Sequence, residues 1–591
     1  IFFQGNDGGS TITALTLDMS DGGAATFAGN VVVGGAGLTM SDADIFFEHT
    51  DGNNYYRLDI DGSANFRIHN TNYDRTDLQI TQSSGAATFA GAVTATTYNG
   101  IPFYSDVANN SMYTHDVSGT DSTAQGNTAY GFNALDAVTG GDLNTVVGYL
   151  AGSAINSGSN NVLMGYATGD ALTTGSDNVA IGYAALSVED TGSKNVAVGK
   201  SALNALNYNG DGYNVAVGYN AGLSVATGAY NTLIGGLAGD ALTTGEMNVA
   251  VGYGSLGSED GNGKCVAIGM SALTSQNAGS EAYNVAVGYN AGYAVTTGTL
   301  NTLVGGLAGD ALTTGNRNIA IGYEALSTED TGSRNVAIGE GSLTLLNYDG
   351  AAYNVAIGYD SGHAMTTGIR NTIIGGLAGD ALTTGVRNVA IGYGALSTED
   401  AHGRNVAIGH ESLVNQNAGA DAYNVAVGYN AGLSVTTGVQ NTLLGGLAGD
   451  ALTTGDNNVV MGYLALSSET LGDRSVAIGN FALQNQNNTS DTDVYNVAIG
   501  YDAGNDITTG VRNTLIGGLA GDALTTGVRN VAIGYAALSQ EDANSYNVAI
   551  GDSALTQLNA GASGYNVAVG YQAGTAVTTG VENTLLGGLA G

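Results

Sequence analysis

A six-residue phrase, Asn-Val-Ala-Ile-Gly-Tyr at residues 178–183, returns many times along the chain. Large and small side chains alternate within the phrase, and this period-two pattern is typical of a β-strand. We therefore expect Val179 and Ile181 to face one side of a sheet and Ala180 to face the other side. A strand this short cannot bury itself, so the phrase predicts that many copies stack on one another.

Variants of the phrase begin at 27 positions, from residue 127 to residue 583. We call the first residue of each variant the anchor. It is asparagine in 25 of the 27 copies, with Cys265 and Ser475 as the exceptions, and the fourth residue after it is glycine in all 27. Successive anchors are 17, 17, 17 and then 19 residues apart, which makes a larger unit of 70 residues. The unit that starts at residue 424 has 72 residues because its last turn carries an insertion.

The 17-residue spacing restricts the fold. A strand followed by a crossover helix needs about 30 residues or more. The spacing suits two short strands and two tight turns, with identical strands running parallel in successive coils. The sequence thus predicts an all-β chain in which residues 127–591 form a parallel β-solenoid, or β-roll, of 27 turns organised in 70-residue super-repeats.

The recurring glycine and asparagine both have structural explanations. Glycine at a strand end suits a positive φ or a backbone approach too close for a Cβ. Asparagine tolerates the left-handed conformation after a turn, and stacked amides can also form a hydrogen-bonded ladder, so a turn residue and a ladder both stay open. The structural repeat positions chosen to represent these two columns are Asn178, Gly182, Asn248, Gly252, Asn318, Gly322, Asn388, Gly392, Asn530 and Gly534.

The first 126 residues follow a different pattern. Residues 1–93 contain two related units, each running from an Ile-Phe-Phe phrase to an Ala-Ala-Thr-Phe-Ala-Gly phrase, with alternating strands and Asp-Gly turns in the second unit. We expect this region to be a β-rich fibre shaft. Residues 94–126 hold the sole proline, Pro102, and are interpreted as a connector and a first cap for the solenoid. No matching C-terminal cap is visible, so we expect the native chain to continue beyond Gly591 or a tail to be removed.

The composition excludes or disfavours several classes of protein. The chain has 591 residues with 95 glycines, one proline, one cysteine and a formal net charge of −37. The near absence of proline excludes collagen, and 43% hydrophobic residues disfavour simple disorder. The negative net charge disfavours nucleic acid as a partner. The sequence contains no run of about 18 apolar residues, so it gives no indication of a membrane-spanning helix. One cysteine excludes a disulfide framework.

Charged residues recur in register with the repeat. Ten of the 14 basic residues directly precede an anchor. Our hypothesis is that they form ion pairs between chains, and the candidates are Arg317, Arg334, Arg387, Arg404, Arg512 and Arg529; exposed surface pairs within one chain are the equally weighted alternative. Repeated acids such as Glu189 and Asp190 are interpreted as a solvated surface, with calcium binding as the less favoured alternative. We expect no metal and no cofactor.

The Asn-Val-Ala-Ile-Gly repeat resembles the head repeats of trimeric autotransporter adhesins and similar repeats in bacteriophage tail-fibre proteins, over residues 127–591. The resemblance implies a left-handed β-roll in an elongated homotrimer whose strand faces form the trimer core. The Ala-Ala-Thr-Phe-Ala-Gly units are similar to shaft segments of phage tail fibres, which often carry a C-terminal chaperone that is cut away. The turns here are longer than is common in adhesin heads, and a coiled-coil stalk and a membrane anchor are not seen in the sequence.

The expected function is therefore a structural one. The resemblance favours a rigid trimeric shaft of a phage tail fibre, located in the virion, which mediates attachment to a host cell. Its expected partners are two further copies of itself, other virion tail proteins, and a host receptor that is a glycan or an outer-membrane protein. A bacterial cell-surface trimeric adhesin is the first alternative. A tailspike enzyme that degrades polysaccharide is the second alternative, although catalysis is not expected because the acidic residues repeat with the scaffold.

Overall fold

The computed structural model describes residues 110–114 and residues 123–591 without 262 and 562, together with ten short strands between residues 6 and 106. The chain divides into two compact units, Ile1–Asn99 and Gly100–Gly591. Their boundary falls inside the predicted connector, residues 94–126.

The first unit contains an antiparallel sheet of five strands in the order β3-β4-β5-β6-β7. The alternating runs that predict strands in the second related unit coincide with β4 and β5, and the register of β5 and β6 shifts between Ile68 and His69. The Asp-Gly turns and most of the first related unit lie outside the described residues. The strands of the N-terminal region are β1 (Asn6–Asp7), β2 (Ser10–Thr11), β3 (Ile45–Glu48), β4 (Tyr55–Ile60), β5 (Phe66–Asn70), β6 (Arg75–Ile80), β7 (Ala87–Phe89), β8 (Thr97–Tyr98) and β9 (Ile101–Pro102).

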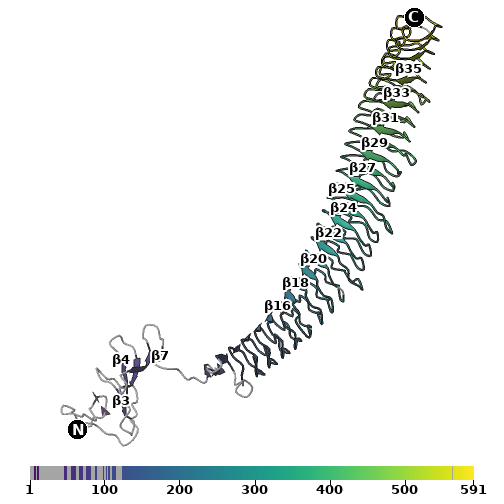
Figure 1. Cartoon of the computed structure of the whole chain (residues 1–591). Coiled ribbons are helices and arrows are strands. Elements are labelled where there is room, and N and C mark those ends of the chain that lie inside the picture. Colours follow the sequence, from purple (N-terminus) through teal and green to yellow (C-terminus); the bar gives the residue numbers. More distant parts are fainter. Residues whose placement is uncertain are drawn as a thin grey trace. The chain divides into compact units, whose positions relative to one another are not determined.

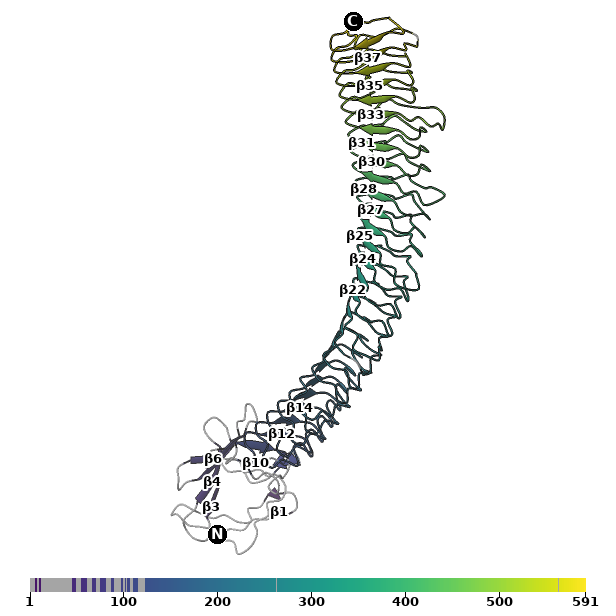
Figure 2. The same cartoon turned by 45° about the vertical axis from the view of Figure 1, so that its right-hand side comes forward.

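The second unit is a β-solenoid (Figures 1 and 2). Its sheet starts with β10 (Tyr104–Asp106), which runs antiparallel to β11 (Ser111–Tyr113). From β11 onward, each strand pairs in parallel with the next strand in chain order, giving a single sheet of 29 strands. The 27 strands of the repeat are β12 (Thr128–Tyr130), β13 (Thr145–Val147), β14 (Val162–Met164), β15 (Val179–Ile181), β16 (Val196–Val198), β17 (Val215–Val217), β18 (Thr232–Ile234), β19 (Val249–Val251), β20 (Val266–Ile268), β21 (Val285–Val287), β22 (Thr302–Val304), β23 (Ile319–Ile321), β24 (Val336–Ile338), β25 (Val355–Ile357), β26 (Thr372–Ile374), β27 (Val389–Ile391), β28 (Val406–Ile408), β29 (Val425–Val427), β30 (Thr442–Leu444), β31 (Val459–Met461), β32 (Val476–Ile478), β33 (Val497–Ile499), β34 (Thr514–Ile516), β35 (Val531–Ile533), β36 (Val548–Ile550), β37 (Val567–Val569) and β38 (Thr584–Leu586).

Each turn of the solenoid contains one strand of three residues, so the expectation of two strands per turn is wrong. The rest of each turn is bent by residues with positive φ, such as Ala184 (φ 50°) and Leu186 (φ 54°), and an extended strand cannot form there. Backbone bonds between neighbouring turns continue through this part nevertheless. The N–H of Leu186, for example, donates to the carbonyl of Ala202 at 3.0 Å. Turn-to-turn pairing therefore extends well beyond the short strands.

The core lies inside the coil, and the small residue of the phrase points into it. Ala180 is fully buried, whereas Val179 and Ile181 on either side are partly exposed. At the eighth residue after the anchor, two turns with glycine are followed by two turns with leucine, as in Gly222, Gly239, Leu256 and Leu273. Gly222 leaves room for leucines of both neighbouring turns, since a Cβ there would lie 2.7 Å from Leu233 and 2.9 Å from Leu203. This complementarity of size explains why the repeat unit is four turns long and not one.

Among the described residues, no helix is long and apolar enough to cross a membrane.

Candidate functional site

The anchor asparagines form a buried ladder that runs along the solenoid. Asn301 is fully buried, and its side-chain oxygen accepts the backbone N–H of the next anchor, Asn318, at 2.9 Å. Its amide nitrogen donates to the carbonyl of Gly315 at 2.9 Å. One side chain thus pairs with a backbone N–H of the following turn and with a backbone carbonyl at the far corner of its own turn. Both groups are buried and would be costly to leave unpaired. Of the two explanations left open by the sequence, the structure shows the ladder.

Two turns lack the anchor asparagine, and in each a buried glutamine replaces part of its bonding. In the turn of Cys265, the side-chain oxygen of Gln276 accepts the amide of Asn284 at 2.7 Å. In the turn of Ser475, Gln486 accepts the amide of Asn496 at 2.8 Å and donates to the serine hydroxyl at 3.1 Å. Cys265 is a buried free thiol, and its pKa is raised to about 11 by burial. These features give Cys265 a structural role and not a reactive one.

Replacing Asn301 with alanine should destabilise its part of the rod by about 1–3 kcal/mol, because the N–H of Asn318 and the carbonyl of Gly315 would both lose buried partners. Hydrogen exchange at the amide of Asn318 measures this effect locally. The control is Asn277→Ala, since Asn277 is exposed. Equal exchange rates in the two variants would contradict a stabilising ladder.

The glycine that ends each strand has a positive φ and touches the same glycine of the next turn. Gly182 has φ 134°, and a Cβ on it would lie 2.4 Å from the carbonyl oxygen of Gly199. Both explanations offered by the sequence, conformation and close approach, therefore apply together at this position.

One acidic position of each 70-residue unit is fully buried, so the interpretation of these acids as a solvated surface is wrong for the glutamates. They are Glu189, Glu259, Glu329, Glu399, Glu469 and Glu541. Each lies eleven residues after an anchor, a core position that leucine occupies in other turns, for example Leu172 and Leu242. The carboxylate of Glu329 accepts the backbone N–H of Gly332 at 2.6 Å and that of Tyr348, in the next turn, at 3.2 Å. The buried glutamate thus binds a corner of its own turn and the turn that follows.

Burial raises the pKa of Glu329 to about 7, while an unfolded glutamate has a pKa of about 4.3. The folded state therefore binds the proton more tightly, and the contribution of Glu329 to stability is fully present below pH 4.3 and is lost as the pH rises through 7. Glu329→Gln removes this titration, so the loss of thermal stability between pH 4.5 and pH 8 should be smaller in the variant than in the wild type. Thermal unfolding at both pH values checks this, with the exposed Glu340→Gln as control. An equal loss of thermal stability between the two pH values in E329Q and in the wild type would contradict the expectation.

The residues that precede the anchors form a second column on the outside of the coil, which we call the cation column. Four of its ten cations pair with an acid of the next turn of the same chain: Lys194 with Asp211 at 2.6 Å, Lys264 with Glu281, Arg404 with Asp421, and Arg474 with Asp493. The guanidinium of Arg529 donates to the hydroxyl of Tyr546 at 2.6 Å, and that of Arg334 to Tyr353. Within the described part of the chain, Arg317, Arg370, Arg387 and Arg512 have neither an ion pair nor a side-chain hydrogen bond.

The tyrosines that follow the strand-ending glycines form a third column, the tyrosine column. Tyr149, Tyr166 and Tyr183 stack in successive turns with ring centroids 5.4 and 5.1 Å apart. Lys200 continues the column, with its ammonium 5.7 Å from the rings of Tyr183 and Tyr219. Each ring is about half exposed, so packing between turns explains only part of its surface.

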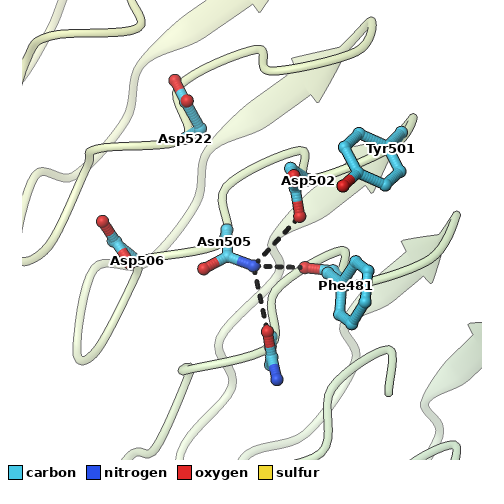
Figure 3. Close-up of a pocket in the computed structure, with 7 residues that line it drawn as sticks. Phe481, Tyr501, Asp502, Asn505, Asp506 and Asp522 are labelled. Carbon is cyan, nitrogen blue, oxygen red and sulfur yellow. Dashed lines mark hydrogen bonds between the residues drawn. The ribbon is translucent and has the colours of Figure 1, made fainter. Parts of the chain in front are cut away.

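A polar hollow of about 350 Å³ opens on the surface after the inserted loop of residues 487–493 (Figure 3). Phe481 and Tyr501 border it, and Asp502, Asp506 and Asp522 contribute carboxylates. The amide nitrogen of Asn505 lies 3.1–3.2 Å from oxygens of Asp502, Gln484 and Phe481, which holds the wall together. Burial and the nearby acids raise the pKa of Asp522 to about 6.

The lining of the hollow departs from the repeat at Asn505 and Asp506. Leucine stands at the position of Asn505 in two sister units, as Leu223 and Leu433, and Ser224 and Ala294 replace Asp506. Carboxylates can accept hydrogen bonds from the hydroxyl groups of a sugar. Aromatic rings beside them can stack on the sugar ring. Sequence reasoning missed this hollow because its residues come from adjacent turns, and only the departure from the repeat at Asn505 and Asp506 signals it.

Comparisons of the chain with protein-family models, with curated proteins and with solved structures found no significant match.

Proposed function

We propose that residues 127–591 form a rigid shaft that assembles with two further copies of itself into the homotrimeric fibre of a bacteriophage tail. The observation that carries this proposal is the outward face of the long sheet. The third residue of each strand is apolar from β13 to β38, and in a single chain this face is partly exposed to water.

The outward face consists of the first and third residues of every strand. The third residue is aliphatic or methionine in all strands from β13 to β38, and no strand of the repeat carries a charge at either position. Ile234 and Ile268 are 39% and 38% exposed. Continuous apolar surfaces of this kind mark interaction sites in soluble proteins. Covering the face contributes on the order of 1 kcal/mol per turn, which over 27 turns is ample for a permanent assembly.

A second copy of the chain is the occupant that fits this face. The apolar columns repeat with the spacing of the turns, and only another solenoid presents the same spacing over the same length. The two edges of the face also differ, since the cation column precedes each strand and the tyrosine column follows it. Copies that run in the same direction around a common axis bring the cation edge of one chain to the tyrosine edge of its neighbour, a contact that closes a ring.

The unpaired arginines support contacts between chains. Arg317, Arg387 and Arg512 lie exposed and have no acidic partner in the described part of their own chain. Stacked cations repel each other, so partners on a neighbouring chain would stabilise the column. Arg404 already has Asp421 in its own chain, which makes it the weakest of the six candidates. Pairing between chains at Arg317, Arg334, Arg387, Arg512 and Arg529 stays a prediction.

A rod with these properties serves as a spacer between the virion and its receptor. Twenty-seven turns at about 4.8 Å per turn give a shaft of about 130 Å. The chain has a net charge of −37, and the acidic residues that are exposed keep neighbouring fibres apart. We propose that other tail proteins hold one end and that a host glycan or outer-membrane protein is reached through the other. Within the described residues, the hollow beside Tyr501 and Asp502 is the best place for a glycan contact.

Antibodies against residues 127–591 test the assignment to a fibre. Electron microscopy should show them along the tail fibres of virions from the same source. Labelling of bacterial surfaces instead would favour the alternative of a cell-surface adhesin, which shares every structural argument above.

The hollow is also the one observation that favours a polysaccharide-degrading enzyme, because an acid with a raised pKa beside further carboxylates is what glycoside hydrolysis requires. We expect no oligosaccharide release when the chain is incubated with host capsule. Release that is abolished in Asp522→Asn would establish the enzyme instead.

A further inference from the structure

One corner of the solenoid brings a histidine to a buried glutamate. Donor atoms of Glu399, Asp400 and His402 all lie within 4.8 Å of one another. The side chain of Glu399 is completely buried, and that of His402 is 29% exposed. No other group of three such side chains occurs in the described ranges of the chain.

Two atoms of this corner are buried without a partner that satisfies them. Oε1 of Glu399 accepts the backbone N–H of His402 at 3.1 Å, whereas Oε2 has no hydrogen-bond partner of normal geometry. Nδ1 of His402 is likewise buried without a hydrogen bond, 3.6 Å from Oε1 of Glu399. Nδ1 thus faces Oε1, which already accepts one hydrogen bond, and the corner leaves a buried carboxylate oxygen and a buried imidazole nitrogen that a shared ligand would satisfy.

Hydrogen bonds from the rest of the solenoid fix the backbone of this corner. The carbonyl of His402 accepts the amide of the anchor Asn388 at 3.1 Å. The carbonyl of Asp400 accepts the hydroxyl of Thr383, in the preceding turn, at 2.8 Å. The backbone of both residues is therefore fixed by the stack, so the three side chains are presented together without the cost of ordering a loop.

We infer that Glu399, Asp400 and His402 bind a divalent transition-metal ion of the zinc type. One oxygen of each carboxylate and Nδ1 of the imidazole would coordinate the ion. Two carboxylates and one imidazole are ligands typical of zinc and its neighbours, whereas calcium prefers oxygen ligands alone. Three protein ligands leave a fourth position for water. The two carboxylates balance the charge of the ion, which removes the cost of burying Glu399 as an anion.

The repeat supplies matched controls. The corner at residues 541–544 has the sequence Glu-Asp-Ala-Asn, and the proposed site has Glu-Asp-Ala-His at residues 399–402. Asn544 makes the same backbone bond to its glutamate, at 3.0 Å, and its amide donates to Oε2 at 2.7 Å. Asn544 thus fills with an amide hydrogen bond the place that a metal would fill beside His402. His402→Asn is therefore a substitution that this fold already tolerates at an equivalent corner.

The test is titration of the untagged full chain with Zn²⁺ after treatment with a chelator, followed by calorimetry and by elemental analysis of the dialysed protein. The wild-type chain is expected to bind one ion per chain, and His402→Asn should weaken that binding by more than about tenfold. Asn544→His should add a second ion per chain. Visible absorption of the Co²⁺ form reports the coordination geometry, and excess Ca²⁺ should not displace the bound ion.

Three results would overturn the inference: no Zn²⁺ binding by the wild-type chain, equal binding by wild type and His402→Asn, or no gain of binding in Asn544→His. Circular dichroism of each variant shows that the solenoid is intact, so that a loss of binding is assigned to the site and not to unfolding.

Discussion

Replacing Gly392 with alanine is expected to destabilise its turn by about 3 kcal/mol or more. Gly392 has φ 133°, a conformation that a residue with a Cβ adopts only with strain. The added Cβ would also lie 2.3 Å from the carbonyl oxygen of Gly409, which is held in the same column by its own turn. The neighbouring turns would have to separate, and backbone hydrogen bonds on both sides would be lost. Hydrogen exchange of the amides in residues 388–425 measures the effect locally, as suits a repeat protein.

The matched control for this change is Gly376→Ala in the preceding turn. Gly376 directly follows Gly375 of the glycine column and has an ordinary φ, and a Cβ on it would lie 3.6 Å from the ring of Tyr393. We expect a change within about 0.5 kcal/mol for this variant. Equal protection from exchange in the two alanine variants would show that contact between the turns does not require glycine.

Replacing Ile234 and Ile268 with aspartate is expected to disrupt the assembly while each rod stays folded. Both side chains are partly exposed on the outward face of the single chain, so the substitution costs the isolated rod little. In the assembled fibre each carboxylate would be buried without a partner, at a cost of about 2–5 kcal/mol per site. The dissociation constant should therefore rise more than about a hundredfold. Sedimentation over a series of concentrations measures it.

Val188→Asp serves as the control for this second change. Val188 is 45% exposed and lies away from the strand face, so Val188→Asp adds one carboxylate to the surface without entering the proposed contact. Dissociation in the Val188 variant to the same degree, or an unchanged assembly in the double isoleucine variant, would contradict an interface built on the strand face.

The repeat made the solenoid predictable, and the limits of that prediction have physical causes. Alternation in the phrase at residues 178–183 correctly predicted a parallel strand with Ala180 and Val179 on opposite sides. The prediction of a second strand in each turn is wrong because residues in the left-handed conformation, such as Leu186, bend the backbone there. Leucine rarely adopts this conformation, so the sequence carries no signal for it.

The candidate sites were less predictable than the fold. The recurrence of Glu189 and Asp190 with the repeat predicts a solvated surface for both, yet Glu189 occupies the core position of Leu172. Counting the register from the anchor would have found this. The corner at His402 had no such signal, because a single histidine in one of six sister corners looks like a chance substitution until its nitrogen is seen beside a buried oxygen.

The mass of the native particle tests the central claim most directly. Multi-angle light scattering and sedimentation velocity of the full chain should give three times the chain mass of 59.0 kDa, with the slow sedimentation of a long rod. A particle of 59.0 kDa at micromolar concentration, with the apolar strand face open to water, would contradict the self-associating fibre.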